Sequence, residues 1–438
     1  MKTGEEAIAW IHSLLPFGIK PGLKRMEWML ERLDNPELKL KTVHIGGTNG
    51  KGSTVSFMRH VLEAAGYKVG TFTSPFIECF EERISINGKP IEEEALVAGA
   101  NRVRPLVEEL AQTELGSPTE FEVITTIMFD YFANVAKPDI ALVEVGLGGR
   151  FDSTNVITPL VSVITSIGFD HMHILGDTLE EITSEKAGII KENVPIVSGV
   201  SQKVAQQLIE DTANKSHSSF YQLGTDFSER LSVVDGRVQV FTLESVSTKY
   251  NDVRIQMPGP HQRQNAAVAF KAIELLANHA DFYVSEEAFY SGMHATTWTG
   301  RFEQISDNPL IILDGAHNKE GFESLSKTLE LHYPEKSYRF LLAATKEKDM
   351  SVLLKPFEKM NATFTFTSFE FFRAAESQTL FEQAQVLQKK YNDDWELALT
   401  EEVRSLREDE MLVVAGSLYF ISSVREKWHQ SAFMYEKI

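Results

Sequence analysis

The sequence predicts an α/β fold with two domains, and three observations support this prediction. The chain has 438 residues, which exceeds the usual size of a single hydrophobic core. Apolar runs alternate with helical patterns along most of its length, as in folds where helices connect the strands of one sheet. Two of these runs, at 139–146 and 159–168, are almost continuously apolar. Such runs are typical of parallel strands that are buried on both faces.

The first domain is expected to span residues 1–296. Its first expected elements are, in order, a strand at 41–45, a helix at 53–67 that stops near Gly66, and a strand at 68–74. Residues 226–257 differ because apolar and polar residues alternate around Asp235-Gly236, a pair typical of hairpin turns. We therefore expect a small β subdomain there, followed by a helix at 258–277.

The second domain is expected to span residues 297–438, with the boundary between about residues 293 and 300. Its apolar runs read as strands that end in polar loops: LIILDGAHN, YRFLLAATK, ATFTFTS and EMLVVAGSLY. Helical patterns lie between these runs, so this domain is predicted to be a smaller, Rossmann-like α/β domain.

The composition narrows the expected partners and compartment. The chain has 62 acidic and 43 basic residues, a formal net charge of −19, which repels nucleic acid phosphates and anionic membranes. Cys79 is the one cysteine, so no disulfide forms within the chain and no cysteine cluster binds zinc. The N-terminus lacks a secretory pattern, and no segment is apolar enough to span a bilayer. We therefore expect a cytoplasmic protein that binds neither nucleic acid nor membranes.

Residues 44–54 read HIGGTNGKGST and lie between a predicted strand and a predicted helix, where phosphate-binding loops occur. Glycines let backbone N–H groups converge on phosphate oxygens, and the helix N-terminus adds a positive dipole end. Lys51 can then reach the terminal phosphates. The segment departs from G-x-x-x-x-G-K-[ST] because Ile45 takes the first glycine position and Gly52 follows the lysine. A glycine-rich turn without phosphate is the alternative to the P-loop NTPase-like domain predicted here.

The segment GTNGKGS resembles the signature of folylpolyglutamate and dihydrofolate synthases, which share a superfamily with the Mur peptidoglycan ligases. The segment TSPFIECFEERISING at 73–88 resembles a loop of that family, although Phe76 stands where the family usually has histidine. The other matching blocks follow in order: FGIKPGLKRM (17–26), EVGLGGRFDSTN (144–155), Asp170-His171, SEKAGIIK (184–191), HQRQNAAVA (261–269), TGRFE (299–303), DGAHN (314–318) and AGSLY (415–419). The resemblance therefore covers nearly the whole chain.

The resemblance implies a set of site residues. The ATP-binding set is Gly47, Thr48, Asn49, Gly50, Lys51, Gly52, Ser53, Asn265, Arg301 and Asp314. The implied magnesium ligands are Ser74, Glu144 and His171, the implied glutamate contacts are His317 and Ser417, and the implied folate contacts are Phe76 and Asp152. The implied catalytic residues are Lys51, Lys186, His171 and Arg301. The matching lysine of the family is carbamylated, so the set includes a carbamylated Lys186, and K⁺ is a candidate activator.

Several of these residues have structural alternatives. Glu144 lies in an apolar strand, where an unpaired carboxylate is costly, so it either binds a metal or forms a core salt bridge. Magnesium prefers oxygen ligands, so the alternatives for His171 are a helix cap and a structural hydrogen bond. Lys186 is expected at the start of a short helix, where a solvated lysine is the ordinary case. The remaining alternatives are a turn for Asp152, a helix cap for Asn265 and a turn for Ser417.

An amide does not form from a carboxylate at neutral pH unless the carboxylate is activated, and phosphorylation by ATP activates it. Such chemistry needs positioning and electrostatic stabilisation, with no protein nucleophile. The resemblance implies a monomeric ligase that joins L-glutamate to the γ-carboxylate of a (tetrahydro)folate through an acyl phosphate. The alternatives are an enzyme that also uses dihydropteroate, a Mur-type ligase that acts on a nucleotide-linked muropeptide, and a non-catalytic ATP-binding switch.

Overall fold

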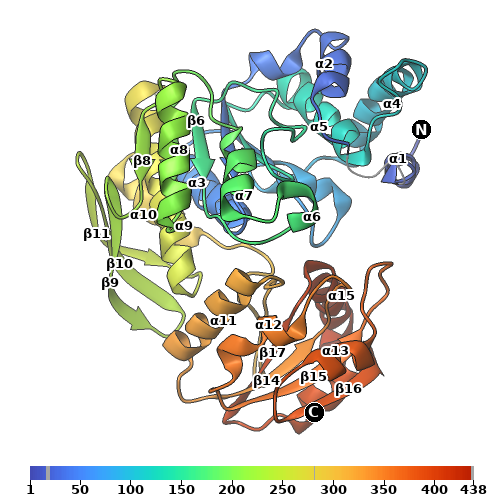
Figure 1. Cartoon of the computed structure of the whole chain (residues 1–438), viewed down its shortest axis with the longest axis vertical. Helices are drawn as coiled ribbons and strands as arrows, with labels where there is room; N and C mark the ends of the chain where they lie inside the picture. Colours follow the sequence, from blue (N-terminus) through green and yellow to red (C-terminus); the bar gives the residue numbers. More distant parts are fainter. Residues whose placement is uncertain (16–19, 281, 436–438) are drawn as a thin grey trace. The chain divides into compact units, whose positions relative to one another are not determined.

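The computed structural model describes residues 1–15, 20–280 and 282–435, so the start of the block at 17–26 lies outside the described residues. The chain forms two compact units (Figure 1). Unit 1 contains residues 1–232, 240–255 and 263–296, and unit 2 contains residues 233–239, 256–262 and 297–438. Within the described residues, no helix is both long enough and apolar enough to cross a membrane.

Unit 1 is built on an eight-stranded sheet with the strand order β4-β3-β2-β5-β1-β6-β7-β8. The six parallel strands are β1 (Thr42–Gly46), β2 (Val69–Phe72), β5 (Ile140–Glu144), β6 (Val161–Ile164), β7 (Ile196–Ser198) and β8 (Phe220–Gln222). The antiparallel strands at one edge are β3 (Ile84–Ile86) and β4 (Lys89–Pro90). Every residue of β1, β2, β5 and β6 is buried, which confirms the buried parallel strands predicted from the apolar runs.

The helices of unit 1 bury their apolar faces against this sheet and one another. One core cluster joins β2 and β5 to α1 (Gly4–His12), α2 (Lys24–Glu31), α4 (Glu93–Leu110) and α5 (Glu120–Asp130). A second cluster joins β6 and β7 to α7 (Leu179–Ala187) and α8 (Lys203–Lys215). α3 (Lys51–Ala64) packs against α10 (Glu286–Ala295). The other helical elements are η2 (Pro36–Lys39), η3 (Phe80–Arg83), η4 (Tyr131–Ala136), α6 (Met172–Leu175) and α9 (Pro260–His279).

Two helices differ from the positions predicted for them. Lys186 lies in the last turn of α7, and the prediction that it begins a helix is wrong. α7 begins earlier because the Thr178 side chain accepts the N–H of Glu181 while the Glu181 carboxylate accepts the N–H of Thr178, a capping box. Asn265 lies inside α9, which already begins at Pro260, so its alternative role as a helix cap is also wrong.

Two predicted strands also end earlier than expected, and this leaves polar residues in loops. β2 ends at Phe72, so Ser74 follows the strand. β6 ends at Ile164, so residues 165–168 form a loop where the apolar run had suggested a longer strand. Both loops leave the sheet at the carboxyl ends of parallel strands, the edge where ligands bind in α/β folds.

A three-stranded sheet follows α8 in the chain. Its strands are β9 (Phe227–Asp235), β10 (Val238–Ser245) and β11 (Lys249–Ile255), in the order β11-β10-β9. The turn between β9 and β10 contains Gly236, whose φ is +57°, a value that glycine adopts without steric cost. The structure thus contains the β9–β10 turn that Asp235-Gly236 predicted.

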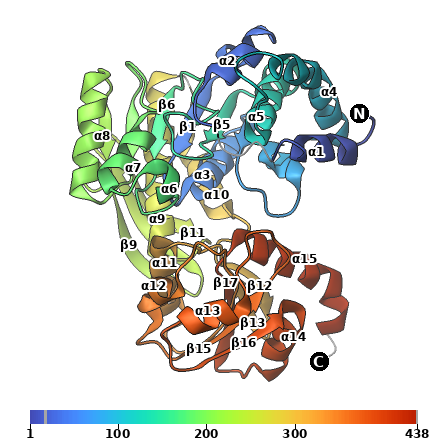
Figure 2. The same cartoon turned by 45° about the vertical axis from the view of Figure 1, so that its right-hand side comes forward.

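Unit 2 is built on a six-stranded sheet with the order β12-β13-β17-β14-β15-β16. Its strands are β12 (Glu303–Asp307), β13 (Leu310–Leu313), β14 (Ser337–Leu342), β15 (Ala362–Ser368), β16 (Lys389–Asp394) and β17 (Glu410–Ala415). β12 is antiparallel to its neighbour β13, and the other neighbouring strands are parallel. One face packs against α11 (Lys319–His332), α12 (Met350–Leu353) and α13 (Ser377–Gln383). The other face packs against α14 (Trp395–Ser405) and α15 (Leu418–Tyr435), and Figure 2 labels these helices.

Candidate functional site

The glycine-rich loop connects β1 to α3 at the carboxyl end of the central strand of unit 1. Gly47 and Gly50 have φ values of +142° and +88°, which side chains with a Cβ atom rarely adopt. A Cβ atom on Gly47 would meet the hydroxyl of Thr165, and one on Gly50 would meet the amide of Asn265. The loop thus needs glycine at both positions, for its backbone angles and for these close approaches.

Lys51 is the first residue of α3 and bends back over the loop. Its Nζ donates hydrogen bonds to the carbonyl oxygens of Gly47 and Thr48, each at 3.2 Å, and lies 3.8 Å from Oε1 of Glu144. The first N–H groups of a helix have no acceptor within the helix, and they carry the positive end of its dipole. The lysine and this helix end together fit the phosphates of a nucleotide.

Glu144 ends β5, directly beside β1, where it pairs with Ile45 in the sheet register. Its side chain is 6% exposed, and its Oε2 accepts the backbone N–H of Ser74 at 3.2 Å. The structure thus brings Glu144, Ser74 and Lys51 together. Magnesium is usually bound by one or two carboxylates and keeps several waters, so the oxygens of Glu144 and Ser74 fit this ion.

His171 lies at the N-cap position of the short helix α6, with a φ of +52° and no side-chain capping hydrogen bond. Its side chain is exposed, and its backbone N–H donates to the carboxylate of Asp170 at 3.0 Å. A ring nitrogen fits magnesium less well than an oxygen does. Among residues 1–15, 20–280 and 282–435, no three or more His, Cys, Asp or Glu side chains are grouped as they would be to hold a metal ion.

Lys186 is 4% exposed and reaches the glycine-rich loop from α7. Its Nζ donates to the carbonyl oxygen of Gly47 at 3.2 Å, an oxygen that also accepts from Lys51. Burial, together with the positive charge of Lys51, lowers the pKa of Lys186 to about 7, and the carboxylates of Asp170 and Asp152 oppose this shift. Near neutral pH, a large fraction of Lys186 is therefore an uncharged amine.

Asp152 is buried and organises the turn that follows Glu144. Its Oδ2 accepts the N–H of Leu147 at 2.8 Å, and its Oδ1 accepts the N–H of Thr154 at 3.0 Å and the hydroxyl of Thr154. Burial raises the pKa of Asp152, and these hydrogen bonds oppose that shift. Phe76 is half-buried on a different loop, 5.9 Å from the ring of Phe80 between centroids.

The predicted site residues of unit 2 gather at the carboxyl ends of β13 and β17, which are parallel neighbours. Asp314 follows β13 and accepts the N–H groups of Phe302 and Ala316, each at 2.9 Å. Burial raises the pKa of Asp314, and the charge of Arg301 opposes this shift. His317 donates its Nδ1–H to the Gly315 carbonyl at 2.8 Å. Ser417 is buried in the loop after β17, where the N–H of Gly416 donates to the Ala316 carbonyl at 2.9 Å.

Three residues that the sequence analysis did not single out contact the glycine-rich loop. Thr165, Ser166 and Gly168 follow β6 and hydrogen-bond to Thr48 and Asn49 of the loop. Their position after an apolar run was a signal, because residues that follow parallel strands often form sites. The apolar run itself continues to residue 168, so the sequence predicts these residues inside the strand, whereas β6 ends at Ile164.

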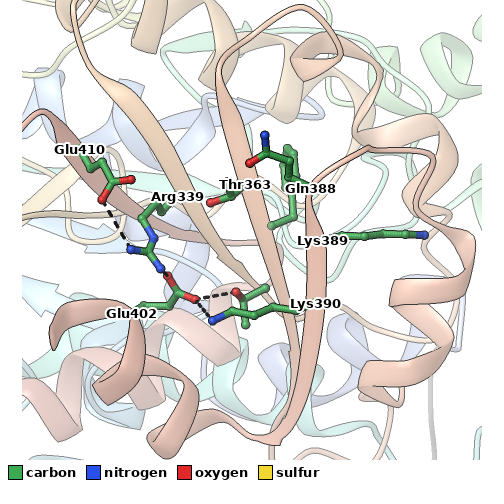
Figure 3. Close-up of a pocket in the computed structure, with 9 residues that line it drawn as sticks. Arg339, Thr363, Gln388, Lys389, Lys390, Glu402 and Glu410 are labelled. Carbon is green, nitrogen blue, oxygen red and sulfur yellow. Dashed lines mark hydrogen bonds and ion pairs between the residues drawn. The ribbon is translucent and has the colours of Figure 1, made fainter. Parts of the chain in front are cut away.

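A pocket of about 270 Å³ in unit 2 lies near the amino ends of its strands, opposite the carboxyl ends where the predicted site residues gather. Four of its lining residues stand near the amino ends of strands: Arg339, Thr363, Lys389 and Glu410. Figure 3 shows that Arg339 lies between Glu402 and Glu410 and that Lys389 points away from them. Ligands of α/β folds bind at the carboxyl ends of the strands, so we assign this pocket to a structural ion-pair network.

Comparison with known proteins adds family information to this geometry. The family model of the Mur ligase middle domain matches residues 45–273, and that of the dihydrofolate synthetase C-terminal domain matches residues 300–426. The sequence is 43% identical over 426 residues to dihydrofolate synthase/folylpolyglutamate synthase of Bacillus subtilis (strain 168). The matched region covers 97% of this chain and 98% of that protein.

Two solved structures resemble the chain over nearly its whole length. The crystal structure of folylpolyglutamate synthase from Thermotoga maritima has 35% identity and a TM-score of 0.84, with 97% of this chain and 96% of that chain covered. An FPGS–AMPPCP–folate complex has 32% identity and a TM-score of 0.81, with 97% and 99% covered. Both likenesses extend through unit 1 and unit 2.

Proposed function

Because the chain belongs to the family of folylpolyglutamate synthases and dihydrofolate synthases, we propose that it is an ATP-dependent ligase that joins L-glutamate to the γ-carboxylate of a (tetrahydro)folate. The products are a folylpolyglutamate, ADP and phosphate. The observation that carries this proposal is the approach of Lys51 to Glu144, at 3.8 Å, beside a glycine-rich loop at the carboxyl edge of the sheet. A related FPGS forms a complex with AMPPCP, an ATP analogue, and with folate.

The reaction has two bond-forming steps. A γ-carboxylate oxygen of the folate attacks the γ-phosphorus of ATP, and ADP leaves. The amino nitrogen of glutamate then attacks the acyl carbon, phosphate leaves, and the nitrogen loses a proton. The residues of unit 1 contribute charge and position, because the Lys51 ammonium and the first N–H groups of α3 balance the charge of the phosphates.

We assign magnesium to Glu144 and Ser74, whose oxygens fit this ion, and include His171 as a third candidate ligand. Magnesium neutralises phosphate charge when it is bound. Without it, Glu144 would repel the phosphates, so its position beside the loop makes chemical sense as part of a cation site. K⁺ stays a candidate activator.

Lys186 is proposed to carry a carbamate. The uncharged amine is the form that reacts with carbon dioxide, and a pKa of about 7 makes this form abundant near neutral pH. A carbamate would replace the positive charge beside Lys51 with a negative one, which removes the repulsion between the two lysines. ¹³C-labelled bicarbonate should give a carbamate NMR signal in the wild type that Lys186→Met lacks, and no such signal in either protein would reject the modification.

For unit 2, we propose that Arg301 and Asp314 contact ATP and that His317 and Ser417 contact the incoming glutamate. Loops at the carboxyl ends of two adjacent parallel strands carry three of these residues, and such loops commonly form ligand sites. For the folate, we propose contacts from Phe76 and Asp152. An Arg301→Lys variant tests the guanidinium, because lysine keeps the charge but lacks the planar donor fork.

A second candidate activity is the addition of glutamate to dihydropteroate. The Bacillus subtilis relative, at 43% identity, is named for both the dihydrofolate synthase and the folylpolyglutamate synthase activities. Dihydropteroate lacks the glutamyl arm of folate and ends in a benzoyl carboxylate, which the same phosphorylation would activate.

Product analysis by mass spectrometry tests the proposed function. The purified protein is incubated with ATP, magnesium and L-glutamate, together with either tetrahydrofolate or dihydropteroate. Addition of one glutamyl unit to tetrahydrofolate, dependent on ATP, supports the ligase proposal, and addition to dihydropteroate supports the second activity. Brisk ATP hydrolysis without either acceptor, and no glutamylated product, would contradict both. We further propose a cytoplasmic monomer, and light scattering on the purified protein tests the monomeric state.

A further inference from the structure

Two loops at the carboxyl edge of unit 1 are joined by hydroxyl groups. The glycine-rich loop follows β1, and residues 165–168 follow the neighbouring strand β6. The hydroxyls of Thr48, Thr165 and Ser166 make the connections between them. We name these three hydroxyl groups the hydroxyl clamp.

Ser166 and Thr165 hold the middle of the glycine-rich loop at Asn49. The Ser166 hydroxyl accepts the N–H of Asn49 and donates to its carbonyl oxygen, both at 2.9 Å. The Thr165 hydroxyl donates to the same carbonyl at 2.6 Å. Thr165 is 5% exposed, and the second acceptor within reach of its hydroxyl is the Gly46 carbonyl at 3.2 Å, also at this loop.

Thr48 makes the reverse connection, from the glycine-rich loop to the other loop. Its hydroxyl accepts the N–H of Gly168 at 3.0 Å and donates to the Gly168 carbonyl at 3.2 Å. Its own backbone N–H donates to the Ser166 carbonyl at 2.8 Å. The single hydroxyl proton of Thr48 is therefore already committed, and the side chain has no donor left for a phosphate.

The clamp determines which loop N–H groups can serve a nucleotide. The N–H groups of Thr48 and Asn49 are both directed to Ser166. The N–H groups from Gly50 into the first turn of α3 have no acceptor within the helix, so they are available to a phosphate. Thr48 and Asn49, both predicted to bind ATP, thus hold the loop in place, Thr48 through its hydroxyl and its backbone N–H and Asn49 through its backbone.

We propose that the hydroxyl clamp is a positioning device that fixes the glycine-rich loop in its nucleotide-binding conformation before the nucleotide arrives. Pre-organisation of a flexible loop lowers the entropy cost of binding. The loop contains four glycines between residues 46 and 52, so without the clamp it would sample many backbone conformations. The proposal rests on the proposed function only in that ATP is the ligand of this loop.

Ser166→Ala and Thr48→Val remove one hydroxyl each with little change in volume. We expect the Kd of ATP and of ADP, measured by isothermal titration calorimetry, to rise about tenfold in each variant, since each loses hydrogen bonds of ordinary strength. For Ser166→Ala, the kcat at saturating ATP should stay near the wild-type value while the KM for ATP rises, because the Ser166 hydroxyl acts equally on ground and transition states. The conservative Thr48→Ser keeps the hydroxyl and should bind ATP within about twofold of the wild type.

Ser162→Ala is the matched control. Ser162 lies on β6, and its hydroxyl donates to the Ile189 carbonyl at 3.0 Å without contacting the glycine-rich loop. It should lower the melting temperature and leave the Kd of ATP unchanged. If Ser166→Ala and Thr48→Val behave in this same way, the clamp has only a structural role and the proposal is overturned. If Thr48→Val does not fold, the comparison of Ser166→Ala with Ser162→Ala decides. Nucleotide binding needs no ligase activity, so a wild type that binds ATP without glutamylating folate would defeat the proposed function alone.

Discussion

Lys51 and Glu144 are the pair on which the proposed chemistry depends. We expect Lys51→Ala and Glu144→Gln each to lower kcat/KM for ATP-dependent glutamylation by at least about 10²-fold, the usual effect of removing one group that stabilises developing charge. The two side chains lie 3.8 Å apart, so losing one also removes an ion-pair contact of the other. Circular dichroism should show an intact fold in both variants.

Lys203→Ala is the control for this experiment, because Lys203 is an exposed lysine at the start of α8. It should retain wild-type turnover. Turnover in Lys51→Ala that matches that of Lys203→Ala would mean that the loop lysine does not act on the phosphates, and the assignment of the site would fail.

Lys186 should make stability depend on pH in a defined direction. Its pKa is about 7 in the folded chain, against 10.5 as the ordinary value. Between these values the unfolded chain binds a proton that the folded chain does not, so the free energy of unfolding rises with pH, by up to about 1.4 kcal/mol per pH unit. Lys186→Met lacks this contribution. The stability of the wild type relative to Lys186→Met should therefore increase between about pH 7 and about pH 10.

Urea unfolding in buffer free of carbon dioxide measures this difference, because a carbamate would replace the titrating amine. The comparison between two proteins cancels the titration of all shared groups. Two stability curves that stay parallel over this pH range would show that Lys186 keeps an ordinary pKa in the folded protein, and the argument for a neutral amine at this position would be lost.

Among the elements of unit 2, strands β14, β15 and β16 and helix α14 meet at one buried carboxylate, Glu402 (Figure 3). Its oxygens lie 2.6 Å from Arg339 and 2.8 Å from Lys390, and they accept the hydroxyl of Thr365 at 2.7 Å. We expect Glu402→Gln to lower the free energy of unfolding by about 3 kcal/mol, because it removes the negative charge at a buried position that pairs with the half-buried Arg339. Denaturant unfolding measures the loss.

The control for this element is Glu396→Gln, on the same helix. Glu396 pairs with Lys427 at 2.6 Å, but both side chains are more than one-third exposed. An exposed pair contributes about 0–1 kcal/mol, so this variant should lose little stability. Equal losses in the two variants would show that burial does not strengthen the Glu402 network.

The elements also show what could be predicted from sequence and what could not. The buried runs of β5 and β6 predicted parallel strands, since continuous apolarity requires burial on both faces. β16 was not predicted, because its residues KKYNDD are polar and the strand lies at the edge of its sheet. The start of α7 is set by a capping box, Thr178 with Glu181, which lies upstream of the SEKAGIIK segment. The prediction that Lys186 begins this helix is therefore wrong.

The candidate site also has residues that could be predicted from sequence and residues that could not. The motif around Lys51 and the carboxylate of Glu144 stood out because glycines and a buried charge are unusual in an apolar context. The hydroxyl clamp did not, because serine and threonine after a strand are common and only the folded chain shows that Ser166 and Asn49 exchange two hydrogen bonds. Contacts between distant segments depend on which strands are neighbours in the sheet, and parallel strands are joined by long crossover connections, with no hairpin turn to specify their partners.

At the scale of the whole molecule, the two units have separate hydrophobic cores, so unfolding should not be a single two-state transition. We expect differential scanning calorimetry to resolve two transitions. ATP at about 100 times its Kd adds about 2.7 kcal/mol to any unit that binds it. The transition of unit 1 should therefore move to higher temperature with ATP and magnesium.

If Arg301 and Asp314 also contact ATP, the transition of unit 2 moves as well, and Arg301→Ala should remove the second shift but keep the first. A shift confined to unit 1 in the wild type would reject the nucleotide role of Arg301 and Asp314, and a shift confined to unit 2 would reject the glycine-rich loop as the phosphate site.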